Sequence, residues 1–346
     1  MKRLLHSRRF QAIASGVLAI GLFAFFLSRV PLSEIGARIA AASPGWLAAS
    51  VAISVGTFAL RALRWVWILR PIGAVPFFPA FRATAVGFAA NAVLPARAGE
   101  VLRPAMLARE RALPFAALLA SIVFERILDA LSQLCFLGFA LTFGPASGVA
   151  ALSTGRLRWA VAGVAAVAVA TALLAVFWRA ATERFLDRLF AVLPERFRPA
   201  ARRIASTFLD GFASLRTPGL AGLVGGASLC LWFVINVQIY CVMRAFGLDL
   251  PLSAAYVVTS AAVLGLVVPT PGGVGGYHAA VQFALTNLFG VPLAVATGVA
   301  LIAHAVSFAP ISLIGFTLFA ASPFRRGGLQ TLASGPEPGR VPPEVG

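Results

Sequence analysis

The sequence has few charged residues: Asp, Glu, Lys and Arg make up only 12% of its 346 residues, whereas 60% are hydrophobic. Soluble globular proteins carry roughly 25% charged residues, so this composition excludes both a water-soluble globule and a disordered chain. Acidic residues are the scarcest, with 12 Asp and Glu against 29 Lys and Arg. The arginines lie beside apolar runs and no motif that reads nucleic acid accompanies them. The net charge of +17 therefore indicates orientation in a membrane and no nucleic-acid partner.

Cysteine and histidine are also rare, with three of each. Cys135, Cys230 and Cys241 lie within apolar runs and have the spacing of neither a zinc site nor a redox pair. The sequence thus predicts no disulfide, no metal and no cofactor. Its basic start and the apolar run 12–28 resemble a signal peptide, but no small-x-small cleavage site follows, so we expect a retained first span.

Long apolar runs predict an all-α polytopic membrane protein, because a helix crosses the hydrocarbon layer with about 20 apolar residues. Two shorter apolar stretches, 80–94 and 253–268, each stop at a proline followed by glycine, which predicts broken or re-entrant helical hairpins. We expect about six full spans in one transmembrane domain, residues 1–321, and a disordered tail, 322–346. The predicted spans are 12–28, 45–69, 115–141, 159–178, 219–243 and 294–320.

The distribution of arginine predicts the orientation of the chain in a bacterial inner membrane. The loop 179–218 carries eight arginines against four acids, and the N-terminus is also basic. Cytoplasmic loops are enriched in Lys and Arg, so we expect this loop and both termini in the cytoplasm. The predicted outer loops, which carry four arginines in all, are 29–44, 142–158, 247–252 and 290–293.

A shift of 174 residues aligns several prolines, glycines and arginines of the two halves, which predicts a repeat of 43–141 in 217–315. The span 159–178 adds one unpaired crossing, so the two repeats would be inverted. Compositional coincidence is the alternative in a chain this rich in Gly and Pro. The aligned pairs are Pro44 and Pro218, Arg70 and Arg244, Gly73 and Gly247, Pro95 and Pro269, and Gly99 and Gly273.

Polar residues gather at the first break. Arg97, Glu100 and Arg103 recur at intervals of three, which predicts that they share one helical face. A guanidinium group holds phosphate in a bidentate way, and a carboxylate holds that guanidinium in position, so this pattern favours an anion site. The alternative is a solvated cytoplasmic loop. The candidate residues here are Asn91, Pro95, Arg97, Gly99, Glu100 and Arg103.

Three charges interrupt the apolar run 115–141: Glu125, Arg126 and Asp129. Charges at this depth do not face lipid, so we expect the trio to face the protein interior or a wet cavity and to compensate one another. An internal salt-bridge clamp is the structural alternative. Arg61 and Arg64 lie near the end of 45–69, where we expect both to snorkel to the interface.

The second break contains prolines and glycines that forbid a continuous helix: Pro269, Pro271, Gly272 and Gly273. Backbone groups freed there, together with a helix N-terminus, favour an anion site. His278 follows, either as a proton relay or as a hydrogen-bonded core residue, and the core role is favoured for a lone histidine.

Three ordered motifs, Leu94 to Arg103, Glu125 to Asp129 and Pro269 to Gly273, resemble the lysylphosphatidylglycerol synthase transmembrane region family, also called flippase-like membrane proteins. The resemblance covers about residues 10–320. It implies a multi-pass inner-membrane protein whose relatives move an aminoacylated phospholipid between leaflets. The soluble synthase domain of those relatives is not expected here, because only a short tail follows Phe324. Where many relatives carry an acid after the second break, this sequence has His278.

Translocation of a phospholipid or a lipid-linked headgroup is therefore the leading functional hypothesis, with anionic membrane lipids as partners and no enzymatic activity. A second hypothesis is an intramembrane enzyme that modifies a lipid or polyprenyl substrate, with Glu100, Glu125 or Asp129 as general base. A third is a noncatalytic membrane partner of a lipid-modifying enzyme.

Overall fold

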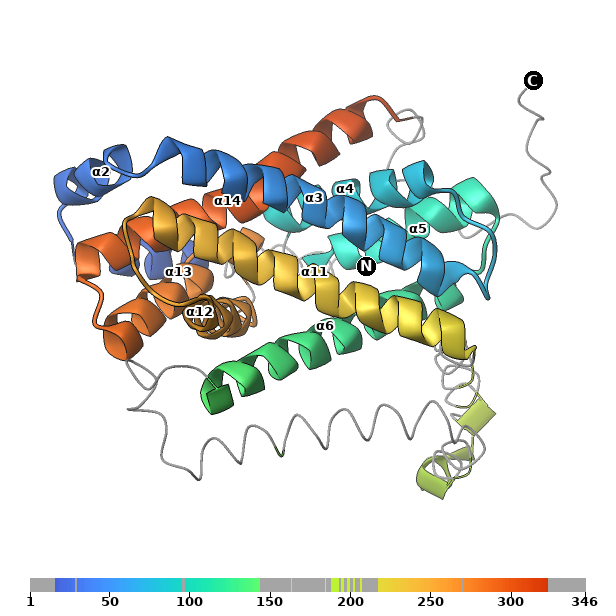
Figure 1. Ribbon diagram of the computed structural model, residues 1–346. Coiled ribbons are helices and arrows are strands. Elements are labelled where there is room, and N and C mark those ends of the chain that lie inside the picture. Colours follow the sequence, from blue (N-terminus) through green and yellow to red (C-terminus); the bar gives the residue numbers. More distant parts are fainter. Residues whose placement is uncertain are drawn as a thin grey trace.

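A computed structural model describes residues 16–28, 30–94, 97–143, 217–268 and 270–322, together with scattered positions between 163 and 206. Within these residues all regular secondary structure is helical (Figure 1), which confirms the all-α prediction. The predicted span 159–178, most of the loop 179–218 and the tail after Ser322 lie outside the described residues.

Three described helices are long and apolar enough to cross a membrane: α3 (Pro44–Leu69), α11 (Pro218–Ala245) and α14 (Leu293–Ala320). The helix Gly16–Leu27 and α2 (Leu32–Ala40) meet at a bend of 80° and add a fourth candidate if they count as one span. The described residues thus contain three or four such helices, against about six spans expected for the chain.

A further helix, α6 (Phe115–Phe143), is as long as these three at 29 residues, but charged side chains interrupt its apolar run. Two of those charges, Glu125 and Asp129, are buried inside the protein, and Arg126 is partly exposed. Helix α6 therefore carries polar side chains into the protein interior as well as packing against its neighbours.

Two pairs of short helices form helical hairpins at the two predicted breaks. In the first, α4 (Phe77–Val93) packs against α5 (Gly99–Arg111). In the second, α12 (Leu252–Gly265) packs against α13 (Gly276–Phe283). The second break contains a single turn, η4 (Pro271–Gly273), and a π-helical turn, η5 (Ala284–Leu288), follows α13. At 1.5 Å per residue α4 and α12 are about 26 and 21 Å long, shorter than the roughly 30 Å hydrocarbon layer.

Glycines allow the two helices of each hairpin to approach closely. A Cβ atom on Gly99 would overlap the carbonyl oxygen of Gly87, so α4 and α5 touch backbone to backbone at this point. In the second hairpin a Cβ on Gly265 or on Gly276 would overlap the carbonyl oxygen of the other. Small residues permit such close helix contacts in membranes, where van der Waals packing and hydrogen bonds hold helices together.

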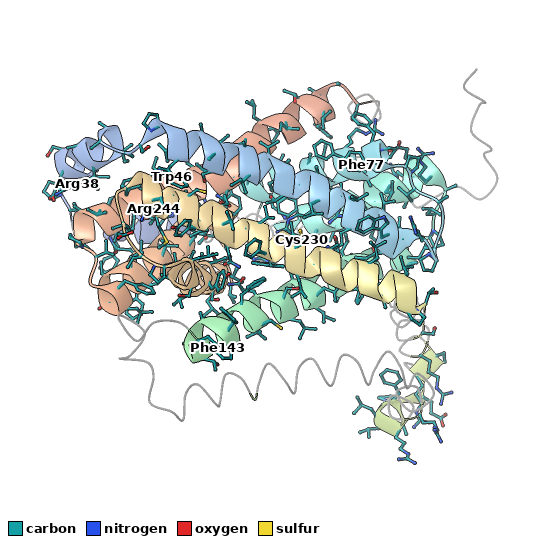
Figure 2. The ribbon with its side chains drawn as sticks, in the orientation of Figure 1. Arg38, Trp46, Phe77, Phe143, Cys230 and Arg244 are labelled. Atoms are coloured by element: carbon teal, nitrogen blue, oxygen red, sulfur yellow. The ribbon has the colours of Figure 1, made fainter. Side chains whose placement is uncertain are left out.

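The long helices α3 and α11 lie side by side and antiparallel (Figure 1). The Ser43 N–H donates to the Ala245 carbonyl at 2.8 Å, and the Ser50 hydroxyl donates to the Gln238 carbonyl at 3.2 Å. Figure 2 shows Trp46 of α3 and Arg244 of α11 at the same end of the pair. Around this pair, α14 packs on α4 and α12 packs on α6, so the last helix of each half covers the first hairpin helix of the other.

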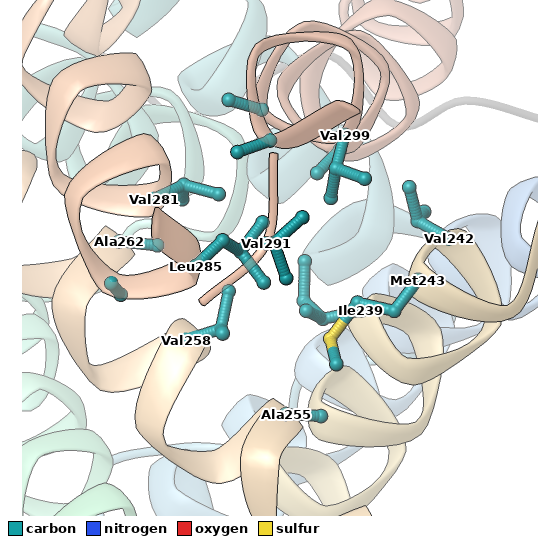
Figure 3. Packing of buried hydrophobic residues seen from close by; sticks show 14 of the residues in the cluster. Ile239, Val242, Met243, Ala255, Val258, Ala262, Val281, Leu285, Val291 and Val299 are labelled. Atoms are coloured by element: carbon teal, nitrogen blue, oxygen red, sulfur yellow. The ribbon is translucent and has the colours of Figure 1, made fainter. Parts of the chain in front are cut away.

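The largest apolar cluster holds the second hairpin against α11 and α14 (Figure 3). It joins Ile239 and Val242 of α11 to Val258 of α12 and to Val281 and Leu285 beyond the break. A second cluster, around the fully buried Trp65, joins α3, α5 and α6 and supports the first hairpin. Each hairpin is therefore held by a packed apolar cluster.

Candidate functional site

A group of buried charged residues lies between α3, α5 and α6. Its members carry four guanidinium groups and two carboxylates, and all are buried except Arg126, which is partly exposed. We call it the arginine cluster: Arg61, Arg64, Arg103, Glu125, Arg126 and Asp129.

Arg64 lies at the centre of the cluster with a side chain that is 0% exposed. Its Nη1 donates to Asp129 Oδ1 at 2.8 Å and to the Ser228 hydroxyl at 3.1 Å, and its Nη2 lies 3.4 Å from Glu125 Oε1. The expectation that Arg61 and Arg64 snorkel to the interface is therefore wrong. Carboxylates on a neighbouring helix stabilise both guanidinium groups inside the protein, so neither needs to reach water.

Glu125 connects three helices because it pairs with Arg64 of α3 and, at 2.6 Å, with Arg103 Nη1 of α5. The Arg103 guanidinium also lies 3.7 Å above the ring of Trp65, whose Nε1 donates to the Ser121 hydroxyl at 2.9 Å. A guanidinium stacked on an aromatic ring and paired with a carboxylate is fixed in both position and plane. Arg103 is thus the most constrained arginine of the first break.

Asp129 accepts from several helices: Arg61 lies 3.4 Å and Arg126 3.3 Å from its Oδ2, and Trp232 Nε1 of α11 donates to its Oδ1 at 2.9 Å. The predicted trio on α6 is indeed turned into the protein. Within the trio Arg126 compensates Asp129 at 3.3 Å, as predicted, whereas Glu125 is compensated from α3 and α5, where it pairs with Arg64 and Arg103. Residues distant in sequence supply these partners, which helical spacing on α6 alone does not reveal.

At the first break, Arg97 precedes α5 and has a left-handed backbone with φ of 52°. It pairs with Glu100 at 3.6 Å, and Arg103 instead faces Glu125. The expectation that Arg97 shares one helical face with Glu100 and Arg103 is wrong, because the helix begins only at Gly99, whereas Glu100 and Arg103 both lie on α5 and line the same cavity. Asn91 fixes that start, since its Oδ1 accepts from the Gly99 N–H at 2.8 Å. The predicted site residue Pro95 lies outside the described residues.

The two breaks touch each other. Arg97 Nη2 of the first donates to the Leu266 carbonyl of the second at 3.0 Å. Gly272, with φ of 61°, lies against the end of α4, where an added Cβ would be 3.4 Å from the Ala92 carbonyl oxygen. Pro271, Gly272 and Gly273 form the turn η4, while Pro269 lies outside the described residues.

His278 is buried at the start of α13 beneath this turn. Its Nδ1 accepts from the Gly275 N–H at 3.3 Å, and its ring lies 4.5 Å from that of His304. His304 Nε2 in turn lies 2.8 Å from the Gly272 carbonyl oxygen. The surroundings of His278 are those of a hydrogen-bonded core residue, which is the role favoured from the sequence.

A small cavity lies beside the arginine cluster, between α4, α5 and α6. The volume accessible to water in this cavity is about 10 Å³, which is close to the minimum needed to hold one water molecule. Among its lining residues are Asn91, Gly99, Glu100, Arg103 and Arg126. Five of the residues predicted from the first break and from α6 thus meet at one cavity. No group of three or more His, Cys, Asp or Glu residues within the described part of the chain is arranged to hold a metal ion.

Sequence reasoning missed the contribution of α3 and α11 to this site. Arg61 and Arg64 interrupt an apolar run just as the charges of α6 do. This interruption identifies them as candidate site residues if their side chains do not reach the membrane interface. Ser228, Trp232 and Trp65 carry no such signal, because serine and tryptophan are common in membrane helices.

Apolar helices of spanning length and a buried charged cluster define this chain as a helical integral membrane protein with a polar site. Residues 12–315 match the family described as "Lysylphosphatidylglycerol synthase TM region", and the chain belongs to that family. The resemblance drawn from its three motifs is thereby confirmed.

Two curated proteins are similar along most of the chain. "Glycosyltransferase AglD" of Haloferax volcanii is 26% identical over 339 residues, covering 89% of this chain and 54% of that protein. The chain therefore spans about half the length of that relative. A "UPF0104 membrane protein" of Methanothermobacter thermautotrophicus is 26% identical over 325 residues. The similar region covers 88% of this chain and 92% of that relative.

Proposed function

We propose that this protein moves a phospholipid or a lipid-linked headgroup across the membrane. The observation that carries the proposal is the contact between the two broken hairpins, Arg97 to the Leu266 carbonyl, beside a buried cluster of charges. Charges and freed backbone groups at membrane depth are costly unless they are paired inside the protein or line a polar cavity, and such residues often mark a substrate path. Membrane transporters commonly build such paths from interrupted helices.

The surroundings of the breaks suit a ligand with a polar head and apolar chains. Val93 and Leu94 at the end of the first hairpin helix are 59% and 45% exposed, and Leu264 and Val267 at the second break are 69% and 74% exposed. Exposed apolar side chains next to a charged cluster allow acyl chains to stay in lipid while the headgroup enters the protein. Arginine is suited to the phosphate of that headgroup because its planar fork donates two parallel hydrogen bonds.

We further propose that 43–141 and 217–315 are inverted repeats, with α3, α4, α5 and α6 corresponding to α11, α12, α13 and α14. The antiparallel pair α3 and α11 and the reciprocal packing of α14 on α4 and α12 on α6 support this relationship. Together with the arginine distribution, it favours cytoplasmic termini in an inner membrane and hairpins that enter from opposite sides. Alternate opening of the two sides would then expose one site to each leaflet in turn.

The relatives support lipid handling without specifying the cargo. The family is named for the membrane region of a lipid-modifying synthase, and the relative from Haloferax volcanii is named a glycosyltransferase. Since this chain spans about half of that protein, the activity of the whole relative does not transfer directly. We expect this chain to supply the membrane step and no catalytic step, because arginines hold both Glu125 and Asp129 as paired carboxylates rather than as free bases.

The test is dithionite quenching of fluorescent phospholipids in proteoliposomes that contain the purified chain, with empty vesicles as control. We expect the wild type to scramble at least one headgroup class and expect Arg97→Ala, Glu100→Ala and Gly273→Leu each to abolish it. Arg97→Lys should be partly active, because an ammonium group keeps the charge but loses the planar fork. Arg82→Gln, at an ion pair away from the breaks, is the matched control.

Scrambling at wild-type rates in all three disruptive variants would refute this site. If the wild type moves no lipid with or without an ion gradient, the chain is better explained as a noncatalytic partner of a lipid-modifying enzyme. Product formation from a lipid or polyprenyl substrate by the purified chain would instead favour the enzyme hypothesis.

A further inference from the structure

The arginine cluster is not electrically balanced. Four guanidinium groups face two carboxylates, Glu125 and Asp129, so the cluster has an excess of two positive charges. Glu100 lines the same cavity and interacts electrostatically with Arg126, but Arg97 pairs with Glu100 at 3.6 Å, so these two residues together leave the excess unchanged. The carboxylates of Glu110 and Asp249 pair elsewhere, with Arg82 and Arg244. Buried charges are strongly penalised unless they are paired, so the excess indicates that an anion completes the cluster.

Two arginines that border the cavity have unsatisfied donors. Arg103, whose side chain is only 4% exposed, has no hydrogen-bond partner at Nε or Nη2, and Arg126 has none at Nε. Both side chains line the cavity between α4, α5 and α6. Glu125 and the ring of Trp65 hold the Arg103 guanidinium in place, so its unsatisfied edge is preorganised rather than free to find another partner.

We propose that this cavity binds a lipid phosphate group with about two or more negative charges, a phosphomonoester or a diphosphate, in preference to a singly charged phosphodiester. The inference rests on the proposed function and names the cargo class of the same site. A phosphomonoester carries a charge of about −1.5 to −2 at pH 7 and matches the excess. A phosphodiester leaves one positive charge uncompensated, and a headgroup ammonium is repelled by the arginines.

Entry of the phosphate requires a local opening, because the cavity has room for about one water molecule in this conformation. Arg126 is the most exposed arginine of the cluster, with 33% of its side chain accessible against 10% or less for the other three. The Arg97 and Glu100 side chains beside it are 52% and 29% exposed. Arg126 thus meets the phosphate first, and outward movement of the Arg97–Glu100 pair admits it to Arg103.

The experiment measures thermal stabilisation of the detergent-purified full chain by three dioleoyl lipids that differ only in headgroup: phosphatidic acid, phosphatidylglycerol and phosphatidylethanolamine. Geranylgeranyl diphosphate and geranylgeraniol form a second matched pair, and inorganic phosphate distinguishes a free anion from a lipid headgroup. At pH 7.5 we expect half-saturation by phosphatidic acid at a concentration at least tenfold below that of phosphatidylglycerol. At pH 5 this advantage should shrink, because the second phosphate pKa is about 6.

The decisive variant is Arg126→Gln, which lowers the excess to one positive charge. We expect it to fold, since Asp129 keeps Arg61 and Arg64, and to bind phosphatidic acid and phosphatidylglycerol within twofold of each other. Arg126→Lys should keep the preference, as should the control Arg82→Gln. Equal binding of the two lipids by the wild type, or a preserved tenfold preference in Arg126→Gln, would overturn the inference.

Translocation is measured separately from binding, in the proteoliposome assay described above. Scrambling of fluorescent lipids without any headgroup preference would refute the cargo class and leave the proposed function intact. A tenfold binding preference without any scrambling would support the anion site and refute translocation.

Discussion

Replacing Asp129 with asparagine should destabilise the protein much more than replacing the partly exposed Glu110 with glutamine. Asp129 Oδ1 accepts from Arg64 and Trp232, while Oδ2 faces Arg61 and Arg126. In the asparagine variant an amide N–H₂ group would replace one carboxylate oxygen. If this group takes the position of Oδ2, it faces the guanidinium groups of Arg61 and Arg126, which are donors themselves and cannot accept its hydrogen bonds. The substitution also raises the buried excess from two positive charges to three.

Removing one partner from a buried ion pair typically costs about 3–5 kcal/mol. Since about 1 kcal/mol shifts the melting temperature by 2–4 °C in chains of 150–250 residues, we expect a decrease on the order of 10 °C for Asp129→Asn. Glu110→Gln serves as control, because Glu110 pairs with Arg82 at 2.5 Å near the surface and their side chains are 24% and 19% exposed. Such a partly exposed pair contributes about 1 kcal/mol or less.

The assay is the temperature at which the detergent-solubilised protein loses its monodisperse peak in size-exclusion chromatography. A second substitution, Arg126→Gln, restores the original charge excess in the Asp129→Asn background and should recover part of the loss, within the 0.5–3 kcal/mol typical of coupled neighbours. The reasoning fails if Asp129→Asn melts within 2 °C of the wild type, as roughly 1 kcal/mol would give, or if the double variant is no more stable than the single one.

Three further predictions concern orientation and the two breaks. Single cysteines at Ser214 and Asp249, in a background without the native cysteines, should differ in labelling by an impermeant reagent. Only position 249 should react from outside, and labelling of position 214 from outside would show that the predicted orientation is wrong. Gly99→Val should lower the yield of folded protein sharply because its side chain would meet the Gly87 carbonyl, whereas Gly138→Ala, with no atom near its added Cβ, should match the wild type. His278→Asn should retain most of the thermal stability, since its Oδ1 can replace Nδ1 as acceptor for the Gly275 N–H, while His278→Leu should lower it; equal stability of the two would rule out a role for this hydrogen bond.

The sequence by itself determined the class, the family and the places where helices break. Apolar runs of spanning length and the scarcity of charge require a helical membrane protein, because only such runs bury their backbone groups in lipid. Proline followed by glycine after 80–94 and 253–268 marks the two hairpin breaks, since these residues end helices through local backbone geometry. The burial of Glu125 and Asp129 also follows from sequence, because their charges interrupt an apolar run.

Only the tertiary structure decided which charges pair. Arg64 reaches Glu125 and Asp129 across more than 60 positions of sequence, and Arg103 joins Glu125 from a third helix, so spacing along one helix does not reveal the partners. For the same reason Arg61 and Arg64 are read as snorkelling from the sequence and are buried in the fold. The contact of Arg97 with the Leu266 carbonyl likewise depends on how the two hairpins pack, because ion pairs and hydrogen bonds act over a few ångströms of space irrespective of sequence separation.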